Sequence, residues 1–209
     1  MKRFEIITET DARVIAHGDT VMLAKGGHIT PLAQDTLKER RITVIGEGRV
    51  SAADQSLVPR ADIRSVAIAS DHAGVALRRT LVAFLRGRGL AVNDLGTDGT
   101  EPVDYPDIAA SVGRLVARGE ADAGIVIDGA GIGSAIAANK IDGIRAVMAT
   151  TETIARYSRE HNGANVLTLG ATLVSADEAR AIVDTWLATA MREPRYIKRL
   201  AKIRDLESR

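Results

Sequence analysis

Cysteine is absent from the 209 residues, and neither basic nor acidic charge is in excess. Without cysteine the chain cannot form a disulfide, a thiolate metal site or a cysteine nucleophile. Lys and Arg number 28 against 27 Asp and Glu, which argues against a protein that coats nucleic acid or a membrane surface. The sequence also lacks the apolar run of a signal peptide or of a membrane span, so a cytoplasmic setting is expected.

What the sequence does contain is typical of a folded, soluble protein. It is 45% hydrophobic and 26% charged, which is enough apolar surface for a core and excludes wholesale disorder. Residues 46–64 are rich in Gly, Ser, Ala and charge without a sustained period, and we interpret them as a linker. The predicted divisions are an N-terminal module at 1–45, this linker, and a main domain at 65–209.

The main domain alternates short apolar runs with amphipathic stretches. The apolar runs are 66–69, 91–95, 124–127, 145–148 and 166–169, and the helical patterns are 74–88, 105–118, 133–139, 151–161, 176–191 and 195–206. Such an alternation predicts βαβ units on a parallel sheet that is buried on both faces. The predicted fold class is α/β: a Rossmann-like, three-layer, doubly wound sheet of five parallel strands.

The first 45 residues have a different pattern, for which we predict a small α+β appendage. Residues 8–11 resemble the start of a helix, and Thr30 with Pro31 is typical of an N-cap and a first helical turn. Segments 20–24 and 42–45 are predicted as short strands. The appendage is too short to bury a large core alone, so we expect it to pack on the main domain or on a partner.

Candidate functional residues lie where the predicted strands end, because doubly wound sheets bind ligands beyond the carboxyl ends of their strands. We expect polar groups from several segments to gather at this one edge of the sheet. They are Asp71 and His72, Tyr105, residues 128–134, Asn139, and the pair His161 and Asn162.

A glycine-rich loop is the most informative of these segments. Gly129, Gly131 and Gly133 leave backbone N–H groups free to converge on an anion, either a phosphate or a developing oxyanion. The GxGxG spacing, its place after the third strand and the lack of a later acidic strand end disfavour a dinucleotide site. The alternative interpretation is a tight connection between a strand and a helix.

Several side chains have both a chemical and a structural interpretation. Asp71 and His72 can orient a substrate hydroxyl or move a proton, whereas Asp71 can also simply cap the following helix. Asp128, beside the loop, suits a general base, and it can equally be a structural carboxylate bonded to loop amides. His161 and Asn162 can instead form the C-cap of a helix.

The last predicted helix carries basic residues at helical spacing. They are Arg195, Lys198, Arg199 and Lys202. Such a stripe can bind a phosphate, or it can be a solvated helix face.

Together these segments resemble the ribose-5-phosphate isomerase B / galactose-6-phosphate isomerase family over about residues 65–207. The matching stretches, in order, are VAIASDHAG (66–74), DYPDIA (104–109), GAGIGSAIAANKIDGIRA (129–146), SREHNGANVLTLG (158–170) and PRYIKRL (194–200). The resemblance implies a cofactor-free aldose–ketose isomerase of phosphorylated sugars. It also implies a homodimer, or a dimer of dimers, with sites formed between two subunits.

The resemblance assigns roles to individual residues. His161 matches the histidine associated with opening the sugar ring, and Asp71 with His72 matches the family's substrate-binding pair. Tyr105 and Asn162 match further residues of the pattern, and Gly129, Gly131 and Gly133 match the loop that stabilises the enediolate. We predict that His161 and His72 are catalytic and that Asp71, Tyr105, the three glycines, Ser134, Asn139 and Asn162 bind substrate. Phosphate binding falls to Arg195 and Arg199, and no metal or other cofactor is implied.

The chain departs from the family pattern at four positions. Asp128 stands where many members have a cysteine base, and Ser134 stands where another branch has a glutamate base. Ala130 replaces a hydroxyl residue, and Thr172 replaces an arginine. A carboxylate can perform proton transfer between adjacent carbons, so we expect Asp128 to be the base.

The N-terminal module resembles the start of an adenosyltransferase of ethanolamine utilisation and of other enzymes of bacterial microcompartments. The shared pattern is ITExxxR, a Gly-containing strand and then ITPLAxDxLxxR. It implies docking to a shell or cargo partner through residues 1–45, and hence a place inside a microcompartment. The alternative is an ordinary extension that covers an edge strand.

The predicted function is an aldose–ketose isomerase of a phosphorylated sugar that acts through a cis-enediolate. The competing hypothesis is a non-catalytic sugar-phosphate-binding or microcompartment assembly protein that has lost the base. Neither the sugar nor the role of the appendage follows from the sequence.

Overall fold

A computed structural model of the chain describes residues 2–46, 52–99 and 101–207. The chain divides into two compact units, Met1–Gln55 and Ser56–Arg209. No helix among the described residues is long and apolar enough to cross a membrane.

The first unit is a three-stranded parallel sheet in the order β1-β2-β3. Its elements are β1 (Arg3–Ile7), α1 (Glu9–Val14), β2 (Thr20–Ile29), α2 (Pro31–Glu39), β3 (Thr43–Gly46) and a short α3 (Ala52–Gln55). Helices α1 and α2 contact one another, and buried side chains such as Ile7, Val21 and Leu37 form a core. Because every strand pair is parallel, this unit is α/β in detail rather than the predicted α+β, and β1 was not predicted.

The helix starts of the first unit follow the sequence signals. Thr8 and Asp11 form a capping box at α1, in which each side chain accepts a bond from the other residue's backbone N–H. Thr30 precedes Pro31 at the start of α2 as predicted, but its hydroxyl makes no capping hydrogen bond.

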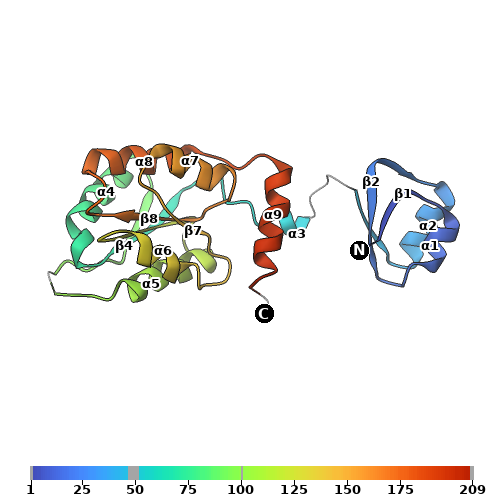
Figure 1. Ribbon diagram of the computed structural model, residues 1–209, viewed down its shortest axis with the longest axis horizontal. Coiled ribbons are helices and arrows are strands. Elements are labelled where there is room, and N and C mark those ends of the chain that lie inside the picture. Colours follow the sequence, from blue (N-terminus) through green and yellow to red (C-terminus); the bar gives the residue numbers. More distant parts are fainter. Residues whose placement is uncertain (1, 47–51, 100, 208–209) are drawn as a thin grey trace. The chain divides into compact units, whose positions relative to one another are not determined.

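The second unit is a five-stranded parallel sheet in the order β5-β4-β6-β8-β7 (Figure 1). The strands are β4 (Ser65–Ser70), β5 (Ala91–Asp94), β6 (Ala123–Asp128), β7 (Ala146–Met148) and β8 (Val166–Gly170). The helices are α4 (Val75–Gly87, preceded by a 3-10 turn at His72–Gly74), α5 (Tyr105–Ala117), α6 (Ile132–Ala138), α7 (Glu152–Glu160), α8 (Ala176–Ala188) and α9 (Pro194–Arg204). The predicted doubly wound α/β class is confirmed.

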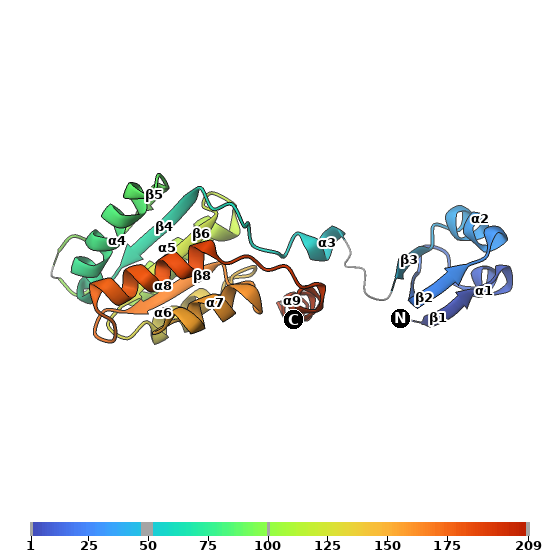
Figure 2. The same ribbon diagram turned by 90° about the horizontal axis from the view of Figure 1, so that it is seen from above.

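Helices cover both faces of this sheet, so side chains on each buried strand point alternately into two cores. On β4, Val66 and Ile68 join the core under α4 and α8, whereas Ala67 and Ala69 join the core under α5 and α6. Figure 2 shows α4 and α8 on one side of the sheet. Burial on both faces explains why the strands are continuous apolar runs without polar alternation.

The predicted linker, 46–64, differs from the structure. Gly46 ends β3, residues 47–51 lie outside the described residues, and residues 56–64 belong to the second unit. In residues 56–64, backbone carbonyls are bound by side chains from elsewhere in the second unit rather than by a strand ladder.

Two arginines hold this segment against the second unit. Arg145 Nη2 donates to the carbonyl of Leu57 at 2.9 Å, and Arg159 Nη2 donates to the carbonyl of Arg60 at 2.8 Å. Burial lowers the pKa of Arg145, and burial together with the nearby Arg145 charge lowers the pKa of Arg159 to about 10.

Candidate functional site

Two of the predicted segments meet at the carboxyl edge of the sheet. Strands β4 and β6 are neighbours, with Ser70 opposite Ile127. The next residues of the two strands, Asp71 and Asp128, therefore lie side by side where the strands end. The Asp71 N–H donates to the Ile127 carbonyl at 3.1 Å. The glycine-rich loop begins at this point, as predicted.

Asp128 is buried, and its carboxylate turns back into its own loop. Oδ1 accepts hydrogen bonds from the backbone N–H groups of Ala130, at 2.8 Å, and Gly131. Oδ2 accepts from the backbone N–H of Ser134, at 3.0 Å, and from its hydroxyl. Four donors match the four acceptor positions of a carboxylate. This geometry agrees with the second interpretation of Asp128, a structural carboxylate bonded to loop amides.

The glycines of the loop are not equivalent. Gly131 has φ 76°, and a Cβ there would lie 2.8 Å from the Leu169 carbonyl carbon. A Cβ on Gly133 would lie 2.5 Å from the Tyr105 ring, which therefore packs directly on the loop. A Cβ on Gly129 would meet nothing within 4 Å. Two of the three positions thus need glycine for steric reasons.

Hydroxyl groups from β8 and the turn after it hold the loop from the other side. Thr168 Oγ1 donates to the Gly131 carbonyl and Thr172 Oγ1 donates to the Gly129 carbonyl, both at 2.7 Å. Thr172 therefore fixes loop backbone at the position where the family resemblance implies an arginine.

Asp71 caps the 3-10 turn that precedes α4. Its Oδ1 accepts from the N–H groups of Ala73, at 2.9 Å, and Gly74, at 3.1 Å, so the capping interpretation also describes this residue. His72 is exposed, and its Nδ1 accepts from the Val103 N–H at 3.4 Å. A neutral imidazole with this bond carries its proton on Nε2, where it can donate to a ligand.

Arg78 on α4 was not predicted to matter at this edge. It is 1% exposed and pairs with Asp94 at 3.1 Å and Asp98 at 2.7 Å, which fixes the start of the connection that leads to Val103 and Tyr105. Gly96 lies so close to the guanidinium that a Cβ at this position would overlap it. The sequence signal that could have identified Arg78 is the position of an arginine within the apolar face of the predicted helix.

His161 and Asn162 do not reach this edge, which corrects the prediction that all candidate residues gather there. Helix α7 runs back from the end of β7, and β8 starts only after His161, so this residue lies at the amino edge of the sheet. The five residues of β8 separate the two edges by about 16 Å at roughly 3.3 Å per residue.

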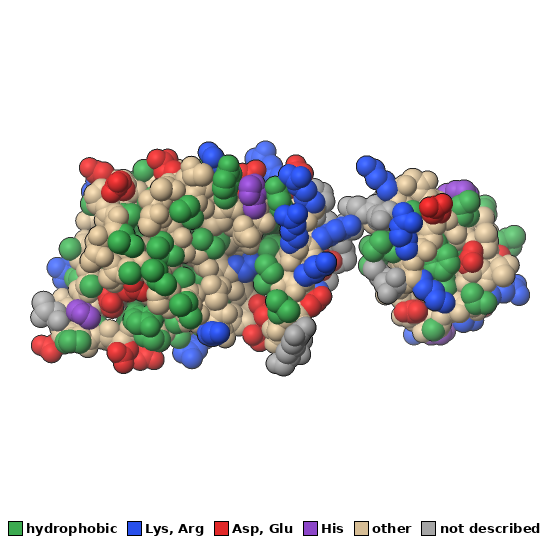
Figure 3. All heavy atoms as spheres, in the orientation of Figure 1, with side chains coloured by type: hydrophobic (Ala, Val, Ile, Leu, Met, Phe, Trp, Pro, Cys, Tyr) green, Lys and Arg blue, Asp and Glu red, His purple; other side chains and the backbone are tan. Residues whose placement is uncertain are grey.

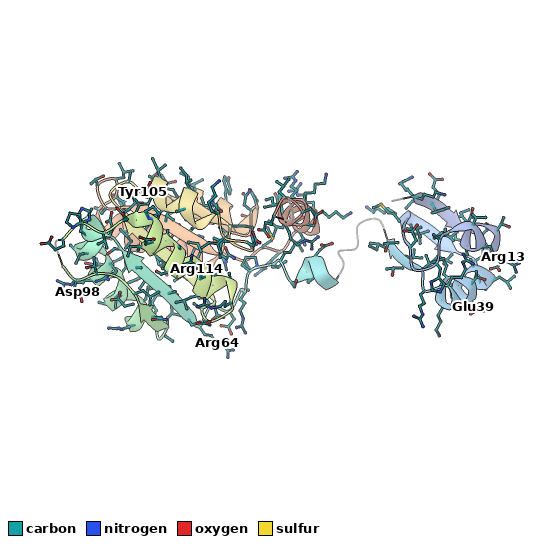
Figure 4. All side chains as sticks on the ribbon, turned by 90° about the horizontal axis from the view of Figure 1, so that it is seen from below. Arg13, Glu39, Arg64, Asp98, Tyr105 and Arg114 are labelled. Atoms are coloured by element: carbon teal, nitrogen blue, oxygen red, sulfur yellow. The ribbon has the colours of Figure 1, made fainter. Side chains whose placement is uncertain are left out.

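Arg195 and Arg199 belong to the amino edge as well. Their helix, α9, lies at the end of the second unit toward which the strand arrows do not point (Figures 1 and 2), and Figure 4 places Tyr105 far from it. Basic side chains gather over α9 in Figure 3. The His161 ring stacks on Tyr157 and Tyr196, each with a centroid distance of 4.7 Å.

Asn139 has a structural role in place of the predicted contact with substrate. Its Nδ2 donates to the carbonyls of Ala135 and Ala146, and its Oδ1 accepts from the Ala146 N–H at 2.8 Å. Asn139 therefore joins the end of α6 to the start of β7. Asn162, by contrast, is exposed and lines a cavity of about 540 Å³ beside α9.

The described residues contain no group of three or more His, Asp or Glu side chains that could hold a metal ion. The arrangement places backbone amides bonded to the Asp128 carboxylate at one edge, and a histidine with two arginines at the other.

Known proteins match the second unit. The model of the family described as Ribose/Galactose Isomerase matches residues 66–203. Ribose-5-phosphate isomerase B of Escherichia coli is 42% identical over 147 residues, which are 70% of this chain and 99% of that protein. The D-erythrulose-4-phosphate isomerase of Pectobacterium atrosepticum is 37% identical over 125 residues, 59% of this chain and 82% of that protein.

Solved structures agree with these matches. Ribose-5-phosphate isomerase B of Clostridium thermocellum superposes with a TM-score of 0.68 at 49% identity, over 69% of this chain and 97% of that one. The type B ribose 5-phosphate isomerase of Trypanosoma brucei gives a TM-score of 0.65 at 42% identity, over 70% of this chain and 100% of that one.

Proposed function

The chain belongs to the Ribose/Galactose Isomerase family and is a sugar-phosphate isomerase, and we propose that it interconverts aldose and ketose forms through a cis-enediolate. One observation carries this proposal: the amides of the glycine loop already hold a negative charge, that of the Asp128 carboxylate. Amides that stabilise a carboxylate are oriented to stabilise an enediolate oxygen.

Asp128 is the proposed base. When the substrate carbonyl oxygen takes over the N–H groups of Ala130 and Gly131, Oδ1 loses its partners and gains a free lone pair. It then removes the proton from the carbon next to the carbonyl, and the electron pair moves onto the carbonyl oxygen. Return of the proton to the former carbonyl carbon, with transfer of the hydroxyl proton between the two oxygens, gives the isomer.

The complete site is proposed to form between two copies of the chain. Asp71, His72, Tyr105 and the glycine loop occupy one edge of the sheet, whereas His161, Arg195 and Arg199 occupy the other. Large apolar side chains are exposed near both edges, Ile132 (52%) and Ile136 (59%) of α6 at the carboxyl edge and Ile203 (40%) of α9 at the amino edge. A second copy that covers them in a homodimer would bring the two edges together.

Solvent-deuterium exchange tests the reaction. The chain is incubated in heavy water with ribose, allose, galactose and tetrose phosphates, which include the substrates named for its relatives. Incorporation of deuterium at the carbon next to the carbonyl is expected for at least one of them. Binding by thermal shift without any exchange would contradict the proposal and leave only a sugar-phosphate-binding role.

Mixed dimers test the shared site. Asp128→Asn and His161→Gln chains, each expected to be inactive on a cyclic sugar phosphate, are co-expressed with different tags and the mixed dimer is purified. One of its two sites is then intact, so about half of the wild-type activity is expected. A mixed dimer as inactive as its parents would show that both residues act within one copy.

The first unit is proposed as a docking module that places this enzyme inside a microcompartment of the cytoplasm. It has its own core, lies outside the family match and exposes Val14 and Leu32, each 71% accessible. The full chain should co-sediment with microcompartment shells, and the change of Val14 and Leu32 to Asp should abolish this. Leu206→Asp, at a position that is 59% exposed in the second unit, is the control.

A further inference from the structure

A column of aromatic rings encloses His161 at the amino edge. Tyr157 lies one turn earlier on α7, with its ring centroid 4.7 Å from the imidazole and the planes 18° apart. Tyr196 of α9 covers the other imidazole face, also at 4.7 Å and with an interplanar angle of 35°. Because described residues cover both faces, the imidazole can meet a ligand through its edge, which carries the two nitrogens. Glu160 Oε1 lies 3.9 Å from Nε2 at this edge.

Tyr196 also contacts both arginines that are proposed to bind phosphate. The Arg195 guanidinium lies 4.7 Å from the ring centroid, and its Nη2 donates to the Tyr196 hydroxyl at 2.8 Å. The Arg199 guanidinium lies 5.6 Å from the same centroid. Neither arginine forms an ion pair within the described part of the chain, so Tyr196 is a main support of both.

Packing fixes Tyr196 itself. It is 8% exposed, and its neighbours Ile197 and Leu200 on α9 are buried. A Cβ on Gly163, two residues after His161, would lie 2.8 Å from the Leu200 side chain, which shows how closely α9 sits on this turn. Tyr196 is therefore a rigid element between the His161 ring and two solvent-facing cations.

We propose that Tyr196 is a positioning residue that holds His161 and Arg195 in register, so that the histidine meets the sugar ring of a substrate whose phosphate the arginine holds. The proposal rests on the proposed function. The hydroxyl places Arg195 for binding, and the ring face orients the imidazole for opening a cyclic sugar. Tyr157 completes the enclosure from the exposed side.

The two contacts predict two separable effects on kinetics. Tyr196→Phe keeps the ring and removes the bond to Arg195, so KM for any phosphorylated substrate should rise severalfold while kcat is kept. Tyr196→Leu removes the ring face, so kcat for a cyclic substrate should fall about tenfold because a misoriented acid or base transfers protons poorly. Tyr157→Phe keeps the ring that stacks on His161 and removes only a hydroxyl. A severalfold rise of KM in this variant as well would overturn the assignment of that effect to the bond between Tyr196 and Arg195.

The choice of substrate separates positioning from general damage. Ribose 5-phosphate closes to a furanose, whereas erythrose 4-phosphate cannot, because its only suitable hydroxyl carries the phosphate. The kcat loss of Tyr196→Leu should therefore be confined to ribose 5-phosphate. An equal loss on both substrates, or an unchanged KM in Tyr196→Phe, would overturn the proposal. If only one substrate is turned over, a kcat loss in Tyr196→Phe as large as that in Tyr196→Leu would overturn it.

A measurement without turnover keeps this test apart from the proposed function. Carbon–proton NMR spectra of the imidazole groups, assigned with His161→Gln, should show His161 displaced upfield by the two ring currents. Tyr196→Leu should remove much of this displacement, and Tyr196→Phe should keep it. An undisplaced His161 signal in the wild-type chain would show that the imidazole is not stacked between Tyr157 and Tyr196. This result would refute the proposal even if the enzyme is active. A displaced signal in a chain that turns over no sugar phosphate would refute the proposed function alone.

Discussion

The two edges of the sheet satisfy their charged groups in opposite ways. At the carboxyl edge, the Asp71 and Asp128 carboxylates are buried and bonded to backbone N–H groups of their own loops. At the amino edge, Arg195 and Arg199 are exposed and rest on an aromatic ring. The first edge is organised before a ligand arrives. At the second edge neither arginine has an ion-pair partner among the described residues, so an anionic ligand would neutralise them. Substitutions should therefore affect folding at the first edge and binding at the second.

The largest effect is expected for Asp128→Asn. The amide has one acceptor oxygen in place of two, so it leaves loop N–H groups unpaired and removes the proposed base. We expect turnover to fall by at least about 100-fold and the free energy of unfolding by about 1–3 kcal/mol. Denaturant unfolding and deuterium exchange measure the two losses. Asp177→Asn, at an exposed position, is the control, and wild-type turnover in Asp128→Asn would exclude Asp128 as the base.

Gly131→Ala should lower the free energy of unfolding by about 3 kcal/mol, through a left-handed φ and a clash with the backbone at Leu169. Gly143→Ala is a matched control, because its φ is 80° but a Cβ there meets nothing within 4 Å. The free energy of unfolding of the control should fall only by the cost of the left-handed φ, about 1–2 kcal/mol. Equal losses in the two variants would mean that the loop is less tightly packed than the structure indicates.

Arg199→Ala tests the other edge. Removal of this cation should raise KM about tenfold, equivalent to roughly 1.4 kcal/mol, because a charged contact to phosphate is lost. The free energy of unfolding should stay within about 0.5 kcal/mol of wild type, since the side chain is exposed. Lys198→Ala on the same helix should change neither. A large loss of stability in Arg199→Ala would erase the contrast between the edges.

The smallest effect is expected for Thr172→Val. It removes the hydrogen bond to the Gly129 carbonyl and should lower the free energy of unfolding by about 1 kcal/mol, measured by chemical denaturation. Thr172→Ser keeps a hydroxyl and should restore most of the loss. Failure of Ser to do so would assign the effect to the methyl group instead.

The elements of the second unit could be predicted because burial on both faces makes its strands apolar runs and its helices amphipathic. The candidates after β4 and β6 could be placed at one edge for the same reason, since parallel strands end together. The misplacement of His161 had a different cause. It stands before β8 rather than after a strand, and a helix that returns to start the next strand must end at the amino edge.

The directions of the side chains could not be predicted from the sequence. Asp128 was equally compatible with a free base and with a loop carboxylate, and only the path of the loop brings the N–H groups of Ala130, Gly131 and Ser134 onto it. Asn139 follows a predicted helix, yet its partner Ala146 lies beyond a turn whose path the sequence does not give. The binding of residues 57–60 by Arg145 and Arg159 left no periodic signal.

The sequence by itself determined the order of strands and helices in the second unit, its α/β class and the family, because these depend on local periodicity and on ordered motifs. Only the tertiary structure decided which charged groups are satisfied internally and which await a ligand. The physical reason is that a hydrogen bond depends on the direction and distance between two groups, and for residues far apart in the chain the packing of the whole domain sets both.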